Sequence, residues 1–482
     1  MENEKGKSDI AKRYSKAILL CYLAFYLFFG VILLLKQPFG DPPDETARYL
    51  IPQYIAEHGR LPNGYDEEIR IGGYGFSYGF QPILPYIVQG GVIRLVSSFT
   101  QNGDVLLYAA RSVNLFLGFL MAITVWKLSQ KWFSDRRFGW LFAFLVTFWQ
   151  ENLFVHTYVN TDSCCMLSTA VMLYGLTRGL EDGFKPLSSV LTAVGIILCA
   201  LSYYNAYGYI LSCILLFTAS YIRITAENGR RRFSFQTKEF LRKGSFLAGL
   251  VILGIGWWFI RNALLYDGDF LGLQARDHCA SLYAVAELNP DTRVTWQNRG
   301  CSVFEMLSRS GFATSTLMSF IGVFGSMKII TSMWIYRFYK AFLLGTCLAC
   351  ACVPASQTRN VSLLYREKKA FGIFYHCNML FCILMPLFLS IVYSYTKEFQ
   401  AQGRYVLPAL IPLCYYCVHG AEKLCKWKAV RRLWGADAEA DKGNKYETAL
   451  SCLTAGLCIL IVVFLAWTIF DYVLPYYAPN AG

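Results

Sequence analysis

Three acidic side chains follow the first apolar segment of the chain. Residues 17–35 carry no charge, and this stretch is long enough to cross a bilayer core. Asp41, Asp44 and Glu45 come shortly afterwards, in the sequence Asp-Pro-Pro-Asp-Glu. A carboxylate at a partly desolvated membrane boundary can act as a general base toward an acceptor hydroxyl, as group transfer requires. Asp44 could equally cap the following helix, and its spacing leaves both interpretations open.

A second acidic position lies in a short predicted turn between two apolar segments. Asn160 and Asp162 frame this turn, with a threonine between them. Asp162 could cap the helix that follows, because an acidic side chain suits the first turn of a helix. It could also face Asp44 across a cavity at the same membrane boundary. The sequence alone does not distinguish the two.

Arginines near the same boundary are candidates for holding a phosphate. Arg404 opens an apolar segment, between Gln402 and Tyr405, and a glycine before it would let the backbone approach an anion. A guanidinium at headgroup level can bind a phosphate through two hydrogen bonds, although a boundary arginine often only reaches toward water. Arg111 lies inside a predicted span, where a buried cation needs a partner. Arg261 ends another span, beside two tryptophans that also suit an aromatic belt.

Composition places the chain among polytopic membrane proteins. Its 482 residues are 55% hydrophobic and only 16% charged, and the mean hydropathy is +0.37, whereas a soluble protein carries roughly a quarter charged residues. The net charge of +13 does not indicate a nucleic-acid partner, because the basic residues concentrate in segments predicted to be cytoplasmic. That asymmetry indicates membrane topology and attraction to anionic lipids.

The hydropathy pattern predicts an all-α protein that forms one transmembrane domain over residues 1–482. Basic residues before the first span place the N-terminus in the cytoplasm and the acidic cluster on the outer face. Two outer loops are long, covering 36–103 and 263–330. The first should hold an amphipathic helix from Asp44 to about His58 and a second helix from Gln81 to Ser98 in the plane of the interface. We predict eleven spans, approximately 17–35, 104–126, 138–156, 163–179, 187–203, 204–222, 244–262, 331–353, 370–393, 404–420 and 448–470.

Most of the 17 cysteines fall inside predicted spans and do not show the spacing of a metal site. Cys279 and Cys301 are different, because they share the second outer loop. They would form a disulfide in an oxidising compartment, or remain two free thiols. No motif requires a cofactor, and no metal ligand set is expected, although a divalent metal stays open.

Several motifs, in their order along the chain, resemble the GT-C superfamily of integral-membrane glycosyltransferases, which includes protein O-mannosyltransferases and lipid A aminoarabinose transferases. Later segments are similar to bacterial members of that superfamily. The motifs of the first loop are Asp44-Glu45-Thr46-Ala47-Arg48-Tyr49, Gln81-Pro82-Ile83-Leu84-Pro85-Tyr86 and Ala109-Ala110-Arg111, and the later ones are residues 257–262, 319–325 and 402–408.

The resemblance implies a GT-C-like helical bundle in a bacterial cell membrane. It implies an inverting transfer of a hexosyl or pentosyl group from a polyprenyl-phosphate-linked donor to a glycan, lipid or protein acceptor at the outer face. Asp44 would be the general base, with Glu45 or Asp162 orienting the acceptor. Arg404, Arg111 or Arg261 would bind the donor phosphate, with Gln402 and Tyr405 framing Arg404. Many relatives have a lysine where Gln81 stands, so this pocket position departs from the family pattern.

Two other classes of function remain as alternatives. A transporter or flippase for a lipid-linked glycan would place charges at the midplane and show related halves, and the sequence shows neither. A non-catalytic membrane scaffold would give no reason for the acidic cluster. The expected partners are therefore the lipid-linked donor, an acceptor and membrane lipids.

Overall fold

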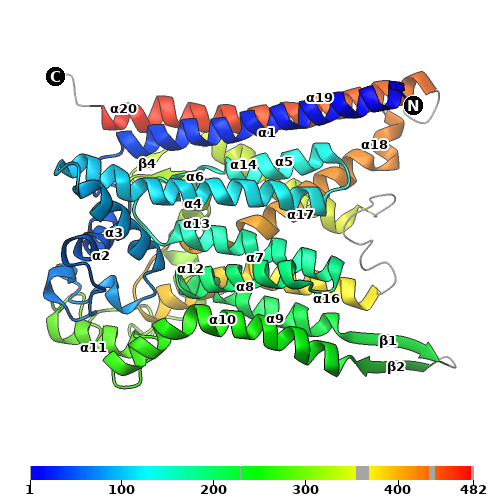
Figure 1. The fold of residues 1–482 in the computed structure, drawn as a ribbon. Helices are drawn as coiled ribbons and strands as arrows, with labels where there is room; N and C mark the ends of the chain where they lie inside the picture. The colour runs from blue at the N-terminus through cyan, green and yellow to red at the C-terminus, as the bar shows by residue number, and fades with distance from the viewer. Residues whose placement is uncertain (1, 228–229, 354–368, 434–439, 479–482) are drawn as a thin grey trace.

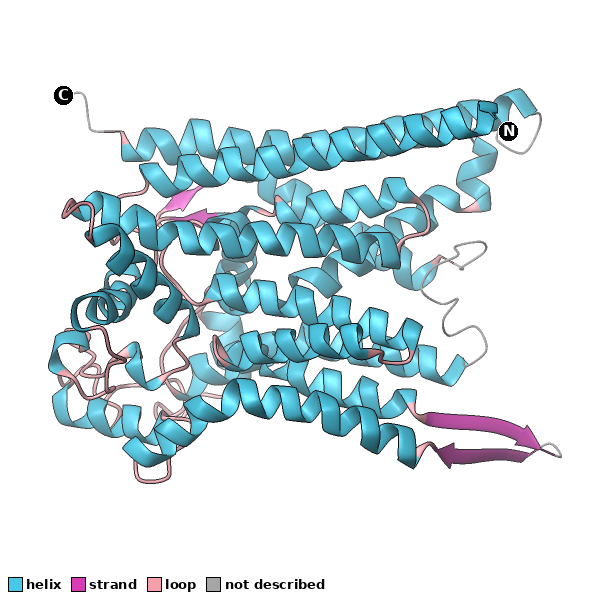
Figure 2. Cartoon of the chain, viewed as in Figure 1, coloured by secondary structure: helices cyan, strands magenta, loops and turns pink. Residues whose placement is uncertain are grey.

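The computed structural model describes residues 2–227, 230–353, 369–433 and 440–478, and it is an all-α polytopic membrane protein (Figures 1 and 2). Long helices lie side by side in one bundle, and short helices and loops gather at one of its ends (Figure 1). The helices are α1 (Glu2–Lys36), α2 (Glu45–His58), α3 (Leu84–Ser97), α4 (Gly103–Trp132), α5 (Arg136–Thr147), α6 (Gln150–Val155), α7 (Asp162–Asp182), α8 (Pro186–Ala200), α9 (Tyr207–Ser220), α10 (Thr237–Leu265), α11 (Leu273–Tyr283), α12 (Val303–Arg309), α13 (Phe312–Gly322), α14 (Met333–Cys352), α16 (Lys369–Thr396), α17 (Leu410–Lys426), α18 (Lys428–Leu433), α19 (Ala440–Thr468) and α20 (Leu474–Tyr477).

Two antiparallel hairpins interrupt the helices. Strand β1 (Ile222–Glu227) pairs with β2 (Arg230–Phe235), with Ile222 opposite Phe235. Strand β3 (Val323–Phe324) pairs with β4 (Ile329–Ile330), with Val323 opposite Ile330. The β1–β2 hairpin was not predicted, because its arginine-rich sequence was interpreted only as an inner loop.

Six helices within the described residues are long and apolar enough to cross a membrane by length and composition. They correspond to the predicted spans 17–35, 104–126, 244–262, 331–353, 370–393 and 448–470. The other five predicted spans are also helical, but they are shorter or more polar, and the eleven-span count stays a prediction. The predicted span 138–156, for example, is divided into α5 and α6.

Close packing around α7 fixes the position of its first residues. A Cβ on Gly175 of α7 would come within 2.6 Å of the backbone nitrogen of Thr192 on α8. A Cβ on Gly195 of α8 would come within 2.7 Å of the backbone nitrogen of Met172 on α7. Small residues therefore let these two helices approach closely, as they do at helix interfaces in membranes. The first residues of α7, including Asp162, are also buried within the bundle.

The two ends of the bundle are different. The N-terminus and the β1–β2 hairpin lie at one end, and α2, α3 and α11 lie at the other, which we call the loop end (Figure 1). Both predicted helices of the first loop are present, and α2 packs on α3 through Ile51, Ile55 and Tyr86. The segments predicted to be outer and inner thus lie at opposite ends, while the orientation of the bundle in the membrane stays a prediction.

Cys279 and Cys301 are free thiols in the structure, so the disulfide alternative is wrong. The Cys279 side chain is buried, and its Sγ donates to the backbone oxygen of Gly75 at 3.3 Å. This contact joins α11 to the first loop and turns the thiol inward. The loop therefore gains its order from packing rather than from a covalent link.

We expect the two thiols to differ in reactivity. Cys301 is partly exposed and Cys279 is fully buried, so a water-soluble alkylating reagent should label Cys301 faster under native conditions. Mass spectrometry of peptides from non-reduced protein measures both labels. A peptide pair linked through Cys279 and Cys301 would contradict the structure.

Candidate active site

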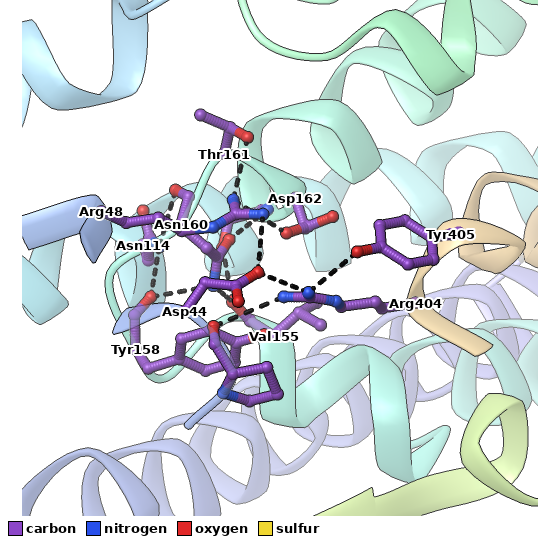
Figure 3. A network of polar contacts seen from close by, with 12 residues as sticks. Asp44, Arg48, Asn114, Val155, Tyr158, Asn160, Thr161, Asp162, Arg404 and Tyr405 are labelled. Atoms are coloured by element: carbon purple, nitrogen blue, oxygen red, sulfur yellow. Dashed lines mark hydrogen bonds and ion pairs between the residues drawn. The ribbon is translucent and has the colours of Figure 1, made fainter. Parts of the chain in front are cut away.

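Asp44 stands at the start of α2 and points away from it. Its backbone adopts a left-handed conformation, with φ of 61°, and such a residue costs about 1–3 kcal/mol and is often found at functional sites. The side chain does not cap the helix, contrary to the capping interpretation. Instead, Asp44 Oδ2 accepts a hydrogen bond of 2.5 Å from Nη2 of Arg404, which comes from the far end of the chain (Figure 3).

Arg48 connects Asp44 to the second acidic position. One turn after Asp44, it places Nη2 at 3.8 Å from Asp44 Oδ2 and Nη1 at 3.3 Å from Asp162 Oδ2 (Figure 3). Nη1 also donates to Thr161 Oγ1 at 3.2 Å. Arg48 was not predicted as a site residue, although an arginine four residues after an aspartate on a helix is placed to form an ion pair.

Asp162 lies close to Asp44, with Arg48 between the two carboxylates. Asp162 is the first residue of α7 and lies in its first turn, but its side chain makes no capping hydrogen bond, and Oδ1 of Asn160 accepts from the backbone N–H of Ser163 at 3.0 Å instead. The Asp162 side chain is buried, and its Oδ1 makes no hydrogen bond within the described residues. The carboxylate is thus oriented by one guanidinium and keeps one oxygen unsatisfied.

A buried amide holds the turn that carries Asn160. Nδ2 of Asn114, on α4, donates to the backbone oxygen of Tyr158 at 2.5 Å and to that of Asn160 at 3.2 Å. Gln89, on α3, donates to Asn114 Oδ1 at 2.8 Å. These polar residues lie within helices that sequence analysis treated as apolar or interfacial, so their role was missed.

Arg404 is almost fully buried, with 3% of its side chain exposed. Its Nη2 also donates to the Tyr405 hydroxyl at 3.1 Å. Gly403 allows a close approach to α13, where its N–H donates to Ser319 Oγ at 2.7 Å and a Cβ would overlap the backbone of Phe320. The absence of a Cβ at Gly403 thus serves its packing on α13, and Gln402 bonds to Gln400 rather than to Arg404. The span predicted at about 404–420 starts with two 3₁₀ turns, and its helix α17 begins at Leu410.

Glu45 and Arg111 form a fully buried ion pair beside this network. Arg111 Nη2 lies 2.5 Å from Glu45 Oε2, and its Nε donates to Oε1 at 2.8 Å. Its Nη1 donates to the backbone oxygens of Leu34 and Gln37, and Glu45 accepts from the N–H of Val159. Neither side chain is exposed to solvent. Without a rearrangement, therefore, neither can contact a donor or an acceptor, and the pair ties α1, α2 and α4 together.

The remaining predicted site residues lie outside the network of Figure 3. Oδ2 of Asp41 accepts from the Tyr477 hydroxyl at 2.6 Å, which joins it to α20. Arg261 donates to the backbone oxygen of Pro62 at 2.6 Å. Gln81 follows a 3₁₀ turn and makes no side-chain hydrogen bond to any part of the chain that the structure describes.

Two opposing effects set the protonation of Asp44. Partial burial acts to raise its pKa, but the charges of Arg404 and Arg48 outweigh burial and lower the pKa to about 2. Asp44 is therefore ionised across the physiological range. It remains a weak base for as long as both arginines stay beside it.

An arginine lies between the two carboxylates of the site. The Arg48 guanidinium bridges Asp44 and Asp162. The positive charges of two arginines balance the negative charges of two aspartates here. Moreover, no group of three or more His, Cys, Asp or Glu side chains within the described ranges is arranged to hold a metal.

No protein-family model and no curated protein matches this sequence. Among solved structures, the chain is similar to the oligosaccharyltransferase of Archaeoglobus fulgidus, tethered with an acceptor peptide containing the NVT sequon. The identity is 13%, the match covers 93% of this chain and 55% of that chain, and the TM-score is 0.51. The apo form of that enzyme gives 14% identity, 93% and 56% coverage and a TM-score of 0.47.

The chain shares the transmembrane fold of this oligosaccharyltransferase. The predicted all-α polytopic membrane fold is thereby confirmed, while the chain spans only about half the length of the oligosaccharyltransferase. Within this fold, the Asp44–Arg48–Asp162–Arg404 network lies between the start of α2, the start of α7 and the 3₁₀ turns before α17.

Proposed function

We propose that this protein is a glycosyltransferase that moves a sugar from a polyprenyl-phosphate-linked donor to an acceptor on a glycan, lipid or protein. In this proposal the loop end of the bundle faces the outside of the cell. The observation that carries the proposal is a network of two acids and two arginines that is incompletely satisfied, in which Asp44 is partly exposed and the other three side chains are buried. Such a network supplies a base and a phosphate ligand at one place.

Four buried polar atoms of the network make no hydrogen bond within the described part of the chain. They are Asp162 Oδ1, Arg48 Nε, Arg404 Nε and the Tyr158 hydroxyl. Buried polar groups in native proteins are nearly always hydrogen-bonded, so several exceptions at one place need an explanation. A bound sugar phosphate that opens the network would, with its hydroxyls and phosphate oxygens, satisfy both the donors and the acceptor.

The chemistry assigns different tasks to Asp44 and Arg404. Asp44 takes the proton from the acceptor hydroxyl as its oxygen forms a bond to the anomeric carbon. The bond from that carbon to the phosphate oxygen breaks on the opposite face, and its electron pair leaves with the phosphate. Arg404 stabilises the growing negative charge on this leaving group. Arg48 and Asp162 position Asp44 and the sugar.

Donor binding would also activate the base. Arg404 now pairs with Asp44, and a phosphate that binds Arg404 competes for the same guanidinium. As the phosphate draws this charge away, Asp44 loses the stronger of the two charges that lower its pKa. Its pKa then rises, so the carboxylate becomes a better proton acceptor only when a donor is present.

Substitution of Arg404 tests the phosphate contact. We expect Arg404→Ala to weaken binding of a polyprenyl-phosphate sugar by roughly 10- to 100-fold, since a charged hydrogen bond is worth about 1.5–3 kcal/mol. Arg404→Lys should lose less, because it keeps the charge but not the planar fork. Asp44→Asn should keep donor binding.

The binding experiment needs a check for folding, because Arg404→Ala removes the partner of Asp44. Thermal unfolding of each purified variant supplies that check. If folded Arg404→Ala binds the donor as tightly as wild type, the phosphate contact lies elsewhere.

Treatment with a chelator tests whether sugar transfer needs a divalent metal ion. Since Arg48 occupies the position between the two carboxylates, sugar transfer should keep most of its rate after exhaustive dialysis against a chelator. Complete loss of transfer, restored by added Mg²⁺ or Mn²⁺, would show that a metal displaces Arg48.

A further inference from the structure

A second site with phosphate-binding chemistry lies at the loop end, apart from the network of Figure 3. A cavity of about 630 Å³ opens between the end of α2, the segment after it and the last turns of α10. It shares no residue with the Asp44 network. One of its lining residues, Tyr54, lies ten residues after Asp44 on α2, so the two sites are about 15 Å apart along that helix.

Two guanidiniums and one carboxylate line this cavity. Arg60 and Arg261 contribute the positive charges and Asp66 the negative one, which leaves a net charge of +1. Neither arginine lies within 4.0 Å of a carboxylate oxygen in any part of the chain that the structure describes. Asp66 instead accepts from the backbone N–H of Asn63 at 2.8 Å. The two cations therefore remain available to an anion.

Both guanidiniums are held in place by aromatic neighbours. Arg261 lies 5.3 Å from the ring centroid of Trp258 and donates one N–H to Pro62. Arg60 lies 5.8 Å from the ring centroid of Tyr54. Cation–π contacts of this kind fix the direction of the side chain without neutralising its charge. The arginines are thus preorganised rather than freely mobile.

The wall of the cavity continues into a strongly apolar helix face. Ile260 and Leu264 of α10 line the cavity and are 62% and 81% exposed. Only 6% of the most apolar window of α10 is buried inside the protein, so this helix faces lipid. Trp257 lies on the same turns, where an aromatic ring suits the membrane–water interface. A ligand here can place a charged group on the arginines and hydrocarbon along α10.

We propose that this cavity binds the headgroup phosphate of an anionic phospholipid from the bilayer, with Arg60 and Arg261 as its ligands. The acyl chains lie along Ile260 and Leu264. The net positive charge favours an anionic headgroup over a zwitterionic one. Arg261, which sequence analysis offered as a ligand for the donor phosphate, is assigned to this separate site. The assignment does not depend on the proposed transferase activity.

The test is native mass spectrometry of the full chain, purified from nanodiscs that contain phosphatidylglycerol or phosphatidylcholine. We expect wild type to retain phosphatidylglycerol selectively. Arg60→Gln should weaken its binding by roughly tenfold, and Arg60→Gln/Arg261→Gln by more, because each removes a charged hydrogen-bond donor. A matched control, Arg299→Gln/Arg309→Gln, removes two exposed charges elsewhere and should leave retention unchanged.

Arg261→Gln could disturb packing, because Arg261 contacts Pro62 and Trp258. Photo-crosslinking of wild type with a photoreactive phosphatidylglycerol avoids this problem and should label residues 60–66 and 257–265. Three results would overturn the proposal. Wild type and both variants could retain phosphatidylglycerol equally, the control could lose it as much as the variants do, or wild type could retain phosphatidylcholine as well as phosphatidylglycerol. Displacement by millimolar inorganic phosphate, which indicates a free-anion site, or preferential retention of polyprenyl phosphate would also overturn it.

Discussion

Replacing Asp44 with asparagine should reduce sugar transfer by roughly 10²–10⁴-fold, the usual cost of losing a general base. Asparagine keeps the size of the side chain and can still accept a hydrogen bond from Arg404, but it cannot take a proton. Donor binding should persist, since the phosphate contact is made by Arg404. The measurement pairs the single-turnover transfer rate with the dissociation constant of the donor for the same preparation.

A neighbouring acid provides the control for that experiment. Asp41 lies three residues earlier, yet it bonds to Tyr477 rather than to the arginines. Asp41→Asn should therefore cost far less transfer activity than Asp44→Asn. Near wild-type transfer by folded Asp44→Asn protein would remove Asp44 from the role of base.

The largest effect on stability should come from breaking the Glu45–Arg111 pair. Arg111→Met leaves the Glu45 carboxylate buried without its partner, which typically costs about 3–5 kcal/mol of folding free energy. The loss should appear as a lower unfolding midpoint in detergent. It should also reduce transfer indirectly, because Glu45 is the first residue of α2 and follows Asp44 directly.

Two further variants test whether the loss of stability is specific to the buried Glu45–Arg111 pair. Glu45→Gln/Arg111→Met removes both charges and should recover part of the stability, since replacing a whole buried pair is often tolerated. Lys131→Met, also on α4, removes the partner of Glu181 on α7, an exposed pair 2.6 Å long. Exposed pairs contribute only about 0–1 kcal/mol. An equal loss in Lys131→Met and Arg111→Met would contradict the structural role assigned to Glu45.

Local sequence patterns predicted much of the fold. An apolar stretch without charges predicted α1, and amphipathic spacing predicted α2 almost to its ends. The β1–β2 hairpin and the division between α5 and α6 were missed. The division lies where Trp149 donates to the backbone oxygen of the distant Phe320, a contact that local hydropathy does not show. The hairpin pairs neighbouring segments, and their arginine-rich sequence was interpreted only as an inner loop.

Most residues of the candidate site were predicted from the sequence, but the contacts between them were not. Asp44, Asp162 and Arg404 were identified from their types and positions, and the structure brings them together. Arg48 was missed, because the sequence shows that it follows Asp44 but not that it reaches Asp162. Arg111 was expected to need a counter-charge, and Glu45 supplies it. Arg111 was predicted to bind the donor phosphate and Glu45 to orient the acceptor, but the complete burial of both side chains does not favour these roles.

The most direct test of the account is sugar transfer by the purified wild-type protein in lipid, with a polyprenyl-phosphate-linked sugar as the only donor. We expect a glycosylated acceptor to form in proportion to the donor consumed, with inversion at the anomeric carbon. Donor that is bound, or moved between leaflets, without cleavage of its bond to phosphate would contradict the account and favour a transporter.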